Sequence, residues 1–148
     1  MLLAAVKRNG KQLEYASEAL QGDKAIVTAA VENCGKALRF AAPAMTKDRD
    51  VVFAAVRQDY DSLKFADESL QSDRDICLAA VSNNGKALKH CAVSMRSDRE
   101  IVLVAVKSDG RSLGLADQTL RDDSEIVMAA VGANAKALKF ASDNQVPF

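Results

Sequence analysis

The sequence has little of several features on which other protein classes depend. Among its 148 residues it has no Trp, two Pro and three Cys, and only 5% of its residues are aromatic. Its apolar runs stay far below the roughly 18 residues of a membrane span, so we expect no transmembrane segment. Lys and Arg (20) balance Asp and Glu (20), and this zero net charge gives no overall attraction to nucleic acid or anionic lipid. With 49% apolar residues, the composition is that of one soluble globular unit.

The three cysteines, Cys34, Cys77 and Cys91, are odd in number and lack paired spacing. The chain does not open with a basic segment followed by an apolar run and a cleavage site. We therefore expect a reducing intracellular compartment, with the cytoplasm favoured over an organelle.

A short repeat, with a period of about 25 residues, runs through the chain without an insertion. Leu recurs at one phase in six copies, and Asp recurs at another phase in five. These residues are Leu13, Leu38, Leu63, Leu88, Leu113 and Leu138, followed by Asp23, Asp48, Asp73, Asp98 and Asp123. The predicted single array consists of repeats 1–25, 26–50, 51–75, 76–100, 101–125 and 126–148. Alternate copies resemble each other more than neighbours do, which indicates that the duplicated unit is a pair of copies.

Each copy predicts two short helices. Residues 98–107 begin with an Asp at the N-cap position, and their apolar side chains sweep about 200° of a helix, so this first helix should be buried on several sides. Residues 86–95 predict a second helix, with Leu88, Cys91 and Met95 facing the core.

The predicted helices meet at pairs such as Asn84-Gly85. Either the Gly adopts a positive φ that ends the first helix, or the Asn caps the second helix. Helices of about ten residues are marginal alone in water, so they must stack. The sequence therefore predicts an all-α fold, an α-solenoid of six two-helix repeats in three pairs, about 50 to 60 Å long.

Residues 98–123 carry the run Asp-Arg-Glu-Ile-Val-Leu, then Ala-Val, a polar pair with Gly, and Leu and Asp again. This pattern resembles the repeats of the domain-of-unknown-function 4116 family over essentially the whole chain, and the unit of that family, about 50 residues, matches the pair of copies found here. The resemblance implies an architecture and no established activity. Tyr60 and Ala135 depart from the pattern at the Gly phase, Val104 replaces an Ala, and the last copy loses the pattern after Ser142.

No motif predicts a catalytic, cofactor or metal site, so we expect no enzyme. His90, the single histidine, holds the phase of Phe40 and Phe65, and packing is favoured over a role in catalysis or metal binding. Acidic pairs such as Asp122-Asp123 coincide with the helix-cap phase, and capping is favoured over calcium. Cys34 lies at a helix junction and is the one thiol expected to be accessible.

Basic residues recur at two phases of the predicted second helix. They are Lys11, Lys36, Lys86, Arg111 and Lys136 at one phase, and Arg39, Lys64, Lys89 and Lys139 at the other. We expect the acidic caps of the first helices to face these cations across repeats, which favours an ion-paired edge. The alternative is a basic strip that follows a phosphate backbone or an acidic protein. The aromatic phase beside it is expected to pack on the neighbouring repeat, leaving no exposed rings for single-stranded nucleic acid.

The first copy begins with apolar residues and lacks the acidic cap of the later copies. Met1, Leu2, Leu3 and Val6 occupy phases that are buried elsewhere, whereas solenoids normally end in a polar outer face. We therefore expect this N-terminal face to dock on another chain, a second copy or further repeats. The tail after Ser142 breaks the pattern, as at a true terminus.

These observations lead to two hypotheses about function. The first is a non-enzymatic protein–protein interaction scaffold or an accessory subunit of a larger assembly. The alternative is the binding of nucleic acid or another polyanion through the basic residues of the second helices.

Overall fold

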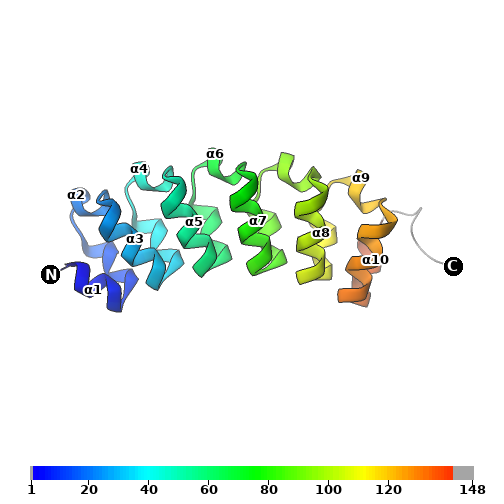
Figure 1. Cartoon of the computed structure of the whole chain (residues 1–148), viewed down its shortest axis with the longest axis horizontal. Helices are drawn as coiled ribbons and strands as arrows, with labels where there is room; N and C mark the ends of the chain where they lie inside the picture. Colours follow the sequence, from blue (N-terminus) through cyan, green and yellow to red (C-terminus); the bar gives the residue numbers. More distant parts are fainter. Residues whose placement is uncertain (1, 142–148) are drawn as a thin grey trace.

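In the computed structural model, which describes residues 2–141, the chain forms one row of short helices (Figure 1). The described residues contain no strand. The main α-helices are α1 (Leu2–Arg8), α3 (Lys24–Asn33), α5 (Arg49–Gln58), α7 (Arg74–Asn83), α8 (Arg99–Ser108) and α10 (Ser124–Ala133). They stand side by side in chain order, from α1 near the N-terminus to α10 near the C-terminus. The predicted all-α solenoid is confirmed.

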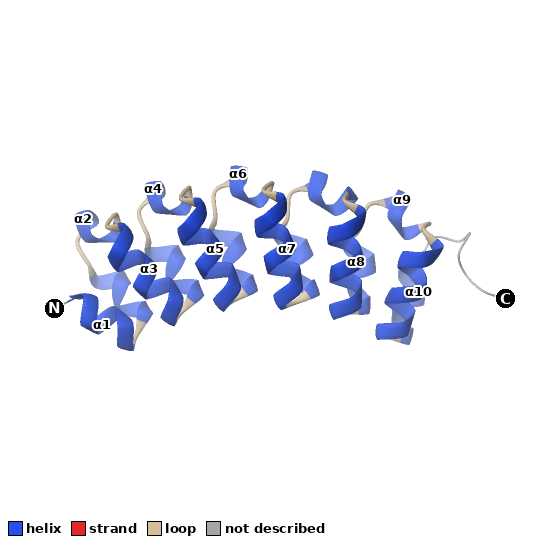
Figure 2. Cartoon of the chain, in the orientation of Figure 1, coloured by secondary structure: helices blue, strands red, loops and turns tan. Residues whose placement is uncertain are grey.

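Behind each main α-helix in the view of Figure 1 lies a 3-10 helix. These are η1 (Gly10–Tyr15), η2 (Gly35–Phe40), η3 (Tyr60–Phe65), η4 (Gly85–His90), η6 (Gly110–Leu115) and η7 (Ala135–Phe140). A further short helix follows each of the first five of these 3-10 helices and lies along the upper edge of the array, where loops connect it to its neighbours (Figure 2). These short helices are α2 (Glu18–Gln21), α4 (Pro43–Thr46), α6 (Glu68–Gln71), η5 (Val93–Ser97) and α9 (Gln118–Arg121).

The second helix of each copy differs from the prediction. A single helix over 86–95 is wrong, because η4 ends at His90 and Cys91 takes an extended conformation with ψ 148°. The extended backbone lets the Ala92 N–H donate to the carbonyl of Gln71 in the preceding copy at 2.9 Å. In other copies Asp67 and Asp117 cap the short turn that follows. Bonding to the neighbouring repeat and a new helix start therefore divide the second helix in two.

The acidic caps of the main helices are confirmed. The carboxylates of Asp48, Asp98 and Asp123 each accept two backbone N–H bonds from the first turn. Asp23 and Asp73 accept one each. Each cap satisfies donors that the start of a helix leaves unpaired.

At the junctions, the asparagine or aspartate caps the 3-10 helix, as the second alternative proposed. Asn84 accepts a bond from the Lys86 N–H at 2.9 Å, and no residue within 2–141 has a positive φ. The glycines serve instead for close approach. A Cβ added to Gly85 would lie under 3.0 Å from the carbonyl oxygen of Ala105 in the next copy. Gly10, Gly35 and Gly110 face the equivalent carbonyl in the same way.

The core runs the length of the array. Leu88 and its equivalents in the first five copies are fully buried, together with Val and Ala residues from the main helices. Ala87 is also fully buried, because the tight curvature of the 3-10 helix turns it inward beside Leu88. The 3-10 helices thereby leave only a narrow outer surface, and the charged side chains lie there.

Candidate interaction surfaces

Although the net charge is zero, charges of opposite sign are separated into two strips on the surface. Along the starts of the main helices lie nine carboxylates and four cations. They are Asp23, Asp48, Asp50, Asp73, Asp75, Asp98, Glu100, Asp123 and Glu125, with Lys24, Arg49, Arg74 and Arg99. On the 3-10 helices and their caps, nine cations stand against Glu14, Asp59, Asp61 and Asp109. We call the first the acidic edge and the second the basic strip.

The acidic edge is a ladder of ion pairs between successive copies. Arg49 contacts the cap carboxylate of Asp73 at 2.8 Å and the carboxylate of Asp75 at 2.9 Å. The Arg49 guanidinium holds the pKa of Asp73 below its ordinary value. Three further rungs follow the same plan, with Lys24 on Asp48 and Asp50, Arg74 on Asp98 and Glu100, and Arg99 on Asp123 and Glu125.

This ladder overturns the prediction that the cap acids face the basic strip. Asp48, Asp73, Asp98 and Asp123 are each paired with a cation that immediately follows the cap of the preceding main helix. Among the described residues, only three members of the basic strip form ion pairs with carboxylates. These are Lys36 with Asp59 and Asp61 at 3.8 and 3.7 Å, Lys64 with Asp61 at 2.8 Å, and Arg111 with Asp109 at 3.6 Å.

Six cations of the basic strip form no ion pair within residues 2–141. They are Lys11, Arg39, Lys86, Lys89, Lys136 and Lys139, and all are exposed. The strip is therefore an underneutralised surface rather than the ion-paired edge that the sequence favoured.

Aromatic side chains are interleaved with these cations. The rings of Phe40, Phe65 and Phe140 are half-buried, and the Arg39 guanidinium lies 5.2 Å from the centroid of Phe40 and 5.9 Å from that of Phe65. Phe140 leans on the preceding copy, since a Cβ on Gly114 would lie 2.7 Å from its ring. Packing on the neighbouring repeat is thus confirmed for Phe140. The prediction that no ring is exposed holds for these three phenylalanines but is wrong for Tyr15, which is 78% exposed. Each phenylalanine ring remains partly accessible, with Arg39 over Phe40 and Phe65, Lys64 over Phe65 and Lys139 over Phe140.

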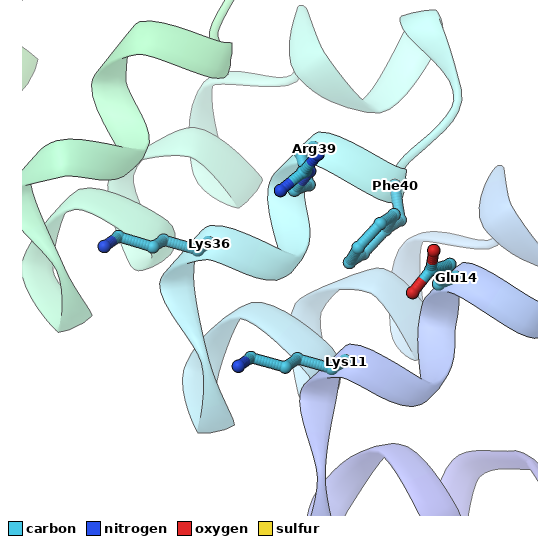
Figure 3. A pocket seen from close by; sticks show the side chains of 5 residues that line it. All are labelled: Lys11, Glu14, Lys36, Arg39 and Phe40. Atoms are coloured by element: carbon cyan, nitrogen blue, oxygen red, sulfur yellow. The ribbon is translucent and has the colours of Figure 1, made fainter.

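A shallow pocket lies on the strip between η1 and η2 (Figure 3). Its volume is about 330 Å³, and its lining comprises Lys11, Glu14, Lys36, Arg39 and Phe40. Lys11 and Lys36 extend in the same direction from adjacent copies, and the Phe40 ring lies between Arg39 and Glu14 (Figure 3). The pocket thus combines three cations with one aromatic ring.

Asp61 is the most strongly held acid of the strip. Its carboxylate is 2.8 Å from the Lys64 ammonium and 2.8 Å from Nε2 of His90 in the next copy. The hydrogen bond from Lys64, reinforced by His90, lowers the pKa of Asp61 to about 2. His90 occupies the aromatic phase, as predicted, and it also makes a polar contact across the third junction.

The N-terminal face is apolar, but its residues differ from those predicted. Val6 is fully buried and Leu2 is half-buried, because both pack on the continuous hydrophobic core of the array. Leu3 is 39% exposed, and Met1 lies outside the described residues. Tyr15, which the sequence reasoning did not single out, is 78% exposed. Its position at the aromatic phase of the first copy, where no preceding repeat covers the ring, was the available signal.

The opposite end also exposes an apolar side chain. Met128 of α10 is 74% exposed, whereas Phe53, Leu78 and Leu103 at the same phase are half-buried against the core. The predicted break in the pattern after Ser142 lies outside the described residues.

The cysteines differ in access as predicted. Cys34 is half-buried, whereas Cys77 and Cys91 are buried. The latter two thiols come together inside the fourth copy, and contact with the Cys91 thiol together with burial raises the pKa of Cys77. The sequence did not reveal this proximity, because it depends on how the main helix packs on the 3-10 helix.

Taken together, these features define a helical repeat protein in which every copy contacts its neighbours through the same groups. None of the described helices is long and apolar enough to cross a membrane. The chain belongs to the family described as "Domain of unknown function (DUF4116)", which matches residues 1–45, 48–96 and 98–144 in tandem. No curated protein and no solved structure matches the chain.

Proposed function

We propose that the array is a non-enzymatic protein–protein interaction scaffold, an accessory part of a larger assembly that docks through its N-terminal face. The observation that carries the proposal is the state of Tyr15. Its ring is 78% exposed, whereas the rings at the same phase in later copies are half-buried by a preceding repeat. Leu3 lies exposed on the same terminal repeat. Isolated repeat arrays cover such end faces with polar residues, so this face suits a partner.

The partner that we propose for this face is a different protein, and the alternatives are a second copy of the chain and further repeats. Four of the five internal junctions place a glycine beneath a carbonyl of the next copy, but Ala135 stands at this phase in the last copy. If the N-terminal face of a second copy were stacked on the C-terminal repeat, Ala135 would stand where glycine stands at those four junctions. The third junction, which has Tyr60 at this phase, shows that two copies also stack without the glycine. Ser124 also lacks the charge that supplies each internal rung of the acidic edge.

The decisive experiment compares co-purification of the tagged full chain from its native cells with that of two variants. Leu3→Ser/Tyr15→Ser removes the apolar side chains of the N-terminal face. Val93→Ser is the matched control, because Val93 is 75% exposed on the upper edge, away from both ends. We expect a stoichiometric partner with the parent chain and the control, and its loss with the double variant.

The proposal would be contradicted if the double variant still retained every partner of the parent chain. It would also be contradicted if the double variant and the Val93→Ser control lost the same partner. Sedimentation velocity of the purified chain distinguishes self-association. If the parent chain formed a concentration-dependent dimer and the double variant did not, the partner on this face would be a second copy of the chain and not a different protein.

A further inference from the structure

The basic strip carries positive charge that the surrounding protein does not neutralise. Each cation of the acidic edge contacts two carboxylates, whereas six of the nine cations of the strip form no ion pair within the described residues. The two sets of cations lie on opposite sides of the same repeats. The difference therefore separates cations that maintain the stack from cations that are available to an anionic ligand.

The spacing of the strip suits a long, extended anion rather than a small one. One cation phase is filled in five of the six copies and the other in four, and stacked helices lie about 8 to 10 Å apart. A strand with the phosphate spacing of one duplex strand, about 3.4 Å, would place roughly 15 phosphates along such an array, and a more extended single strand would place fewer. The cations are distributed along the whole array, and three of them line the pocket between η1 and η2.

The rings favour single-stranded nucleic acid over other polyanions. Phe40, Phe65 and Phe140 are partly accessible, and the cations Arg39, Lys64 and Lys139 lie over their rings at 5.2, 5.2 and 5.0 Å from the centroids. Unpaired bases stack on aromatic rings without regard to sequence, whereas a duplex hides its bases and an acidic peptide has none. The pocket of Figure 3, at the first junction, contains the Phe40 ring between Arg39 and Glu14, and Lys11 and Lys36 complete its lining.

From this arrangement we propose that the 3-10 face of the array binds single-stranded nucleic acid, with the cations along its backbone and the partly accessible rings against its bases. Binding is independent of sequence, because neither phosphates nor ring faces distinguish the bases. The acidic edge, on the opposite side, takes no part.

The first test measures the salt dependence of binding by fluorescence anisotropy with a labelled oligothymidylate of 20 nucleotides. Six unpaired cations predict a slope of log affinity against log salt of about −4. This slope corresponds to a loss of roughly 300-fold between 50 and 200 mM salt. An absence of binding at 50 mM salt would overturn the proposal.

Matched triple variants identify the surface. Lys86→Gln, Lys89→Gln and Lys136→Gln remove three unpaired cations and should reduce the slope to about −2. Lys24→Gln, Arg49→Gln and Arg74→Gln remove the same charge from the acidic edge and should leave slope and affinity unchanged. Circular dichroism checks that both variants remain folded. Equal effects of the two triple variants would mean that overall charge, and not the strip, governs binding.

The remaining arms establish the class of ligand. Phe40→Leu and Phe65→Leu together should weaken binding of the oligothymidylate by at least about 5-fold per ring, and leave binding of poly-glutamate unchanged. A duplex of the same length should bind more weakly than the single strand. Poly-glutamate bound as tightly as the oligonucleotide, or no effect of the ring variants, would overturn the assignment in favour of an acidic protein surface.

Discussion

Gly85 offers a sharp test of how the copies are joined. Its backbone conformation suits any residue, because its φ is not positive. A methyl group at Gly85 would nevertheless lie under 3.0 Å from the Ala105 carbonyl oxygen and 2.8 Å from the Ser112 hydroxyl. A backbone carbonyl in a packed helix can move only slightly. Overpacking in Gly85→Ala should therefore lower the free energy of unfolding by an amount near the upper end of about 1 to 3 kcal/mol. Reduced entropy of the unfolded chain returns about 0.4 to 1 kcal/mol, leaving a net loss of about 2 kcal/mol.

Gly132 is the matched control. It lies in α10, and nothing stands within 4 Å of a Cβ added there. Gly132→Ala should therefore stabilise the chain by about 0.5 to 1 kcal/mol, because alanine is the better helix former. Urea unfolding followed by circular dichroism measures both variants, and the expected difference between them is about 3 kcal/mol. If Gly85→Ala were as stable as the parent chain while Gly132→Ala behaved as expected, the close approach of the repeats would be refuted.

Two further predictions concern titration and reactivity. The folded-state pKa of Asp61 lies at about 2, below the ordinary 3.8, so its ionised form stabilises the fold above pH 4 and this contribution is lost as the pH falls toward 2. In Asp61→Asn the unfolding free energy should therefore fall less over this pH range, by at most about 2 kcal/mol, as measured by urea titrations at each pH. If the unfolding free energy depended on pH in the same way in the variant and the parent chain, the assigned pairing of Asp61 with Lys64 and His90 would be contradicted. At neutral pH, maleimide labelling followed by mass spectrometry should modify Cys34 alone, because Cys77 and Cys91 are buried. Rapid modification of all three thiols in the folded chain would contradict this packing.

Much of the fold could be predicted from the sequence because it depends on contacts within one copy. Leu88 and Asp98 hold the same roles in every repeat, so their periodicity indicated a core and a cap. The break after His90 was missed although Asp67, Asp117 and Pro43 signal a helix start in other copies. Averaging over the repeats gave more weight to the apolar spacing than to these residues.

The candidate surfaces were harder to predict because they depend on how one copy is displaced against the next. That displacement decides whether the Asp73 carboxylate meets Arg49 or a lysine of a 3-10 helix, and the spacing within a copy is compatible with either. The same displacement leaves the phenylalanine rings partly accessible. For this reason the sequence identified the nine cations of the strip, but not which of them are unpaired.

The alternation at one buried position of the 3-10 helices has a consequence for how such arrays can change in length. Ser62 and Ser112 are buried in odd-numbered copies, whereas Ala37 and Ala87 occupy the position in even-numbered ones. Each serine lies over the glycine of the copy before it, Ser62 over Gly35 and Ser112 over Gly85. Deleting or duplicating a single copy would place two like copies next to each other and create a junction that the present chain does not contain. Adding or removing two successive copies reproduces existing junctions, so a change in length by a pair of repeats preserves the packing of the array.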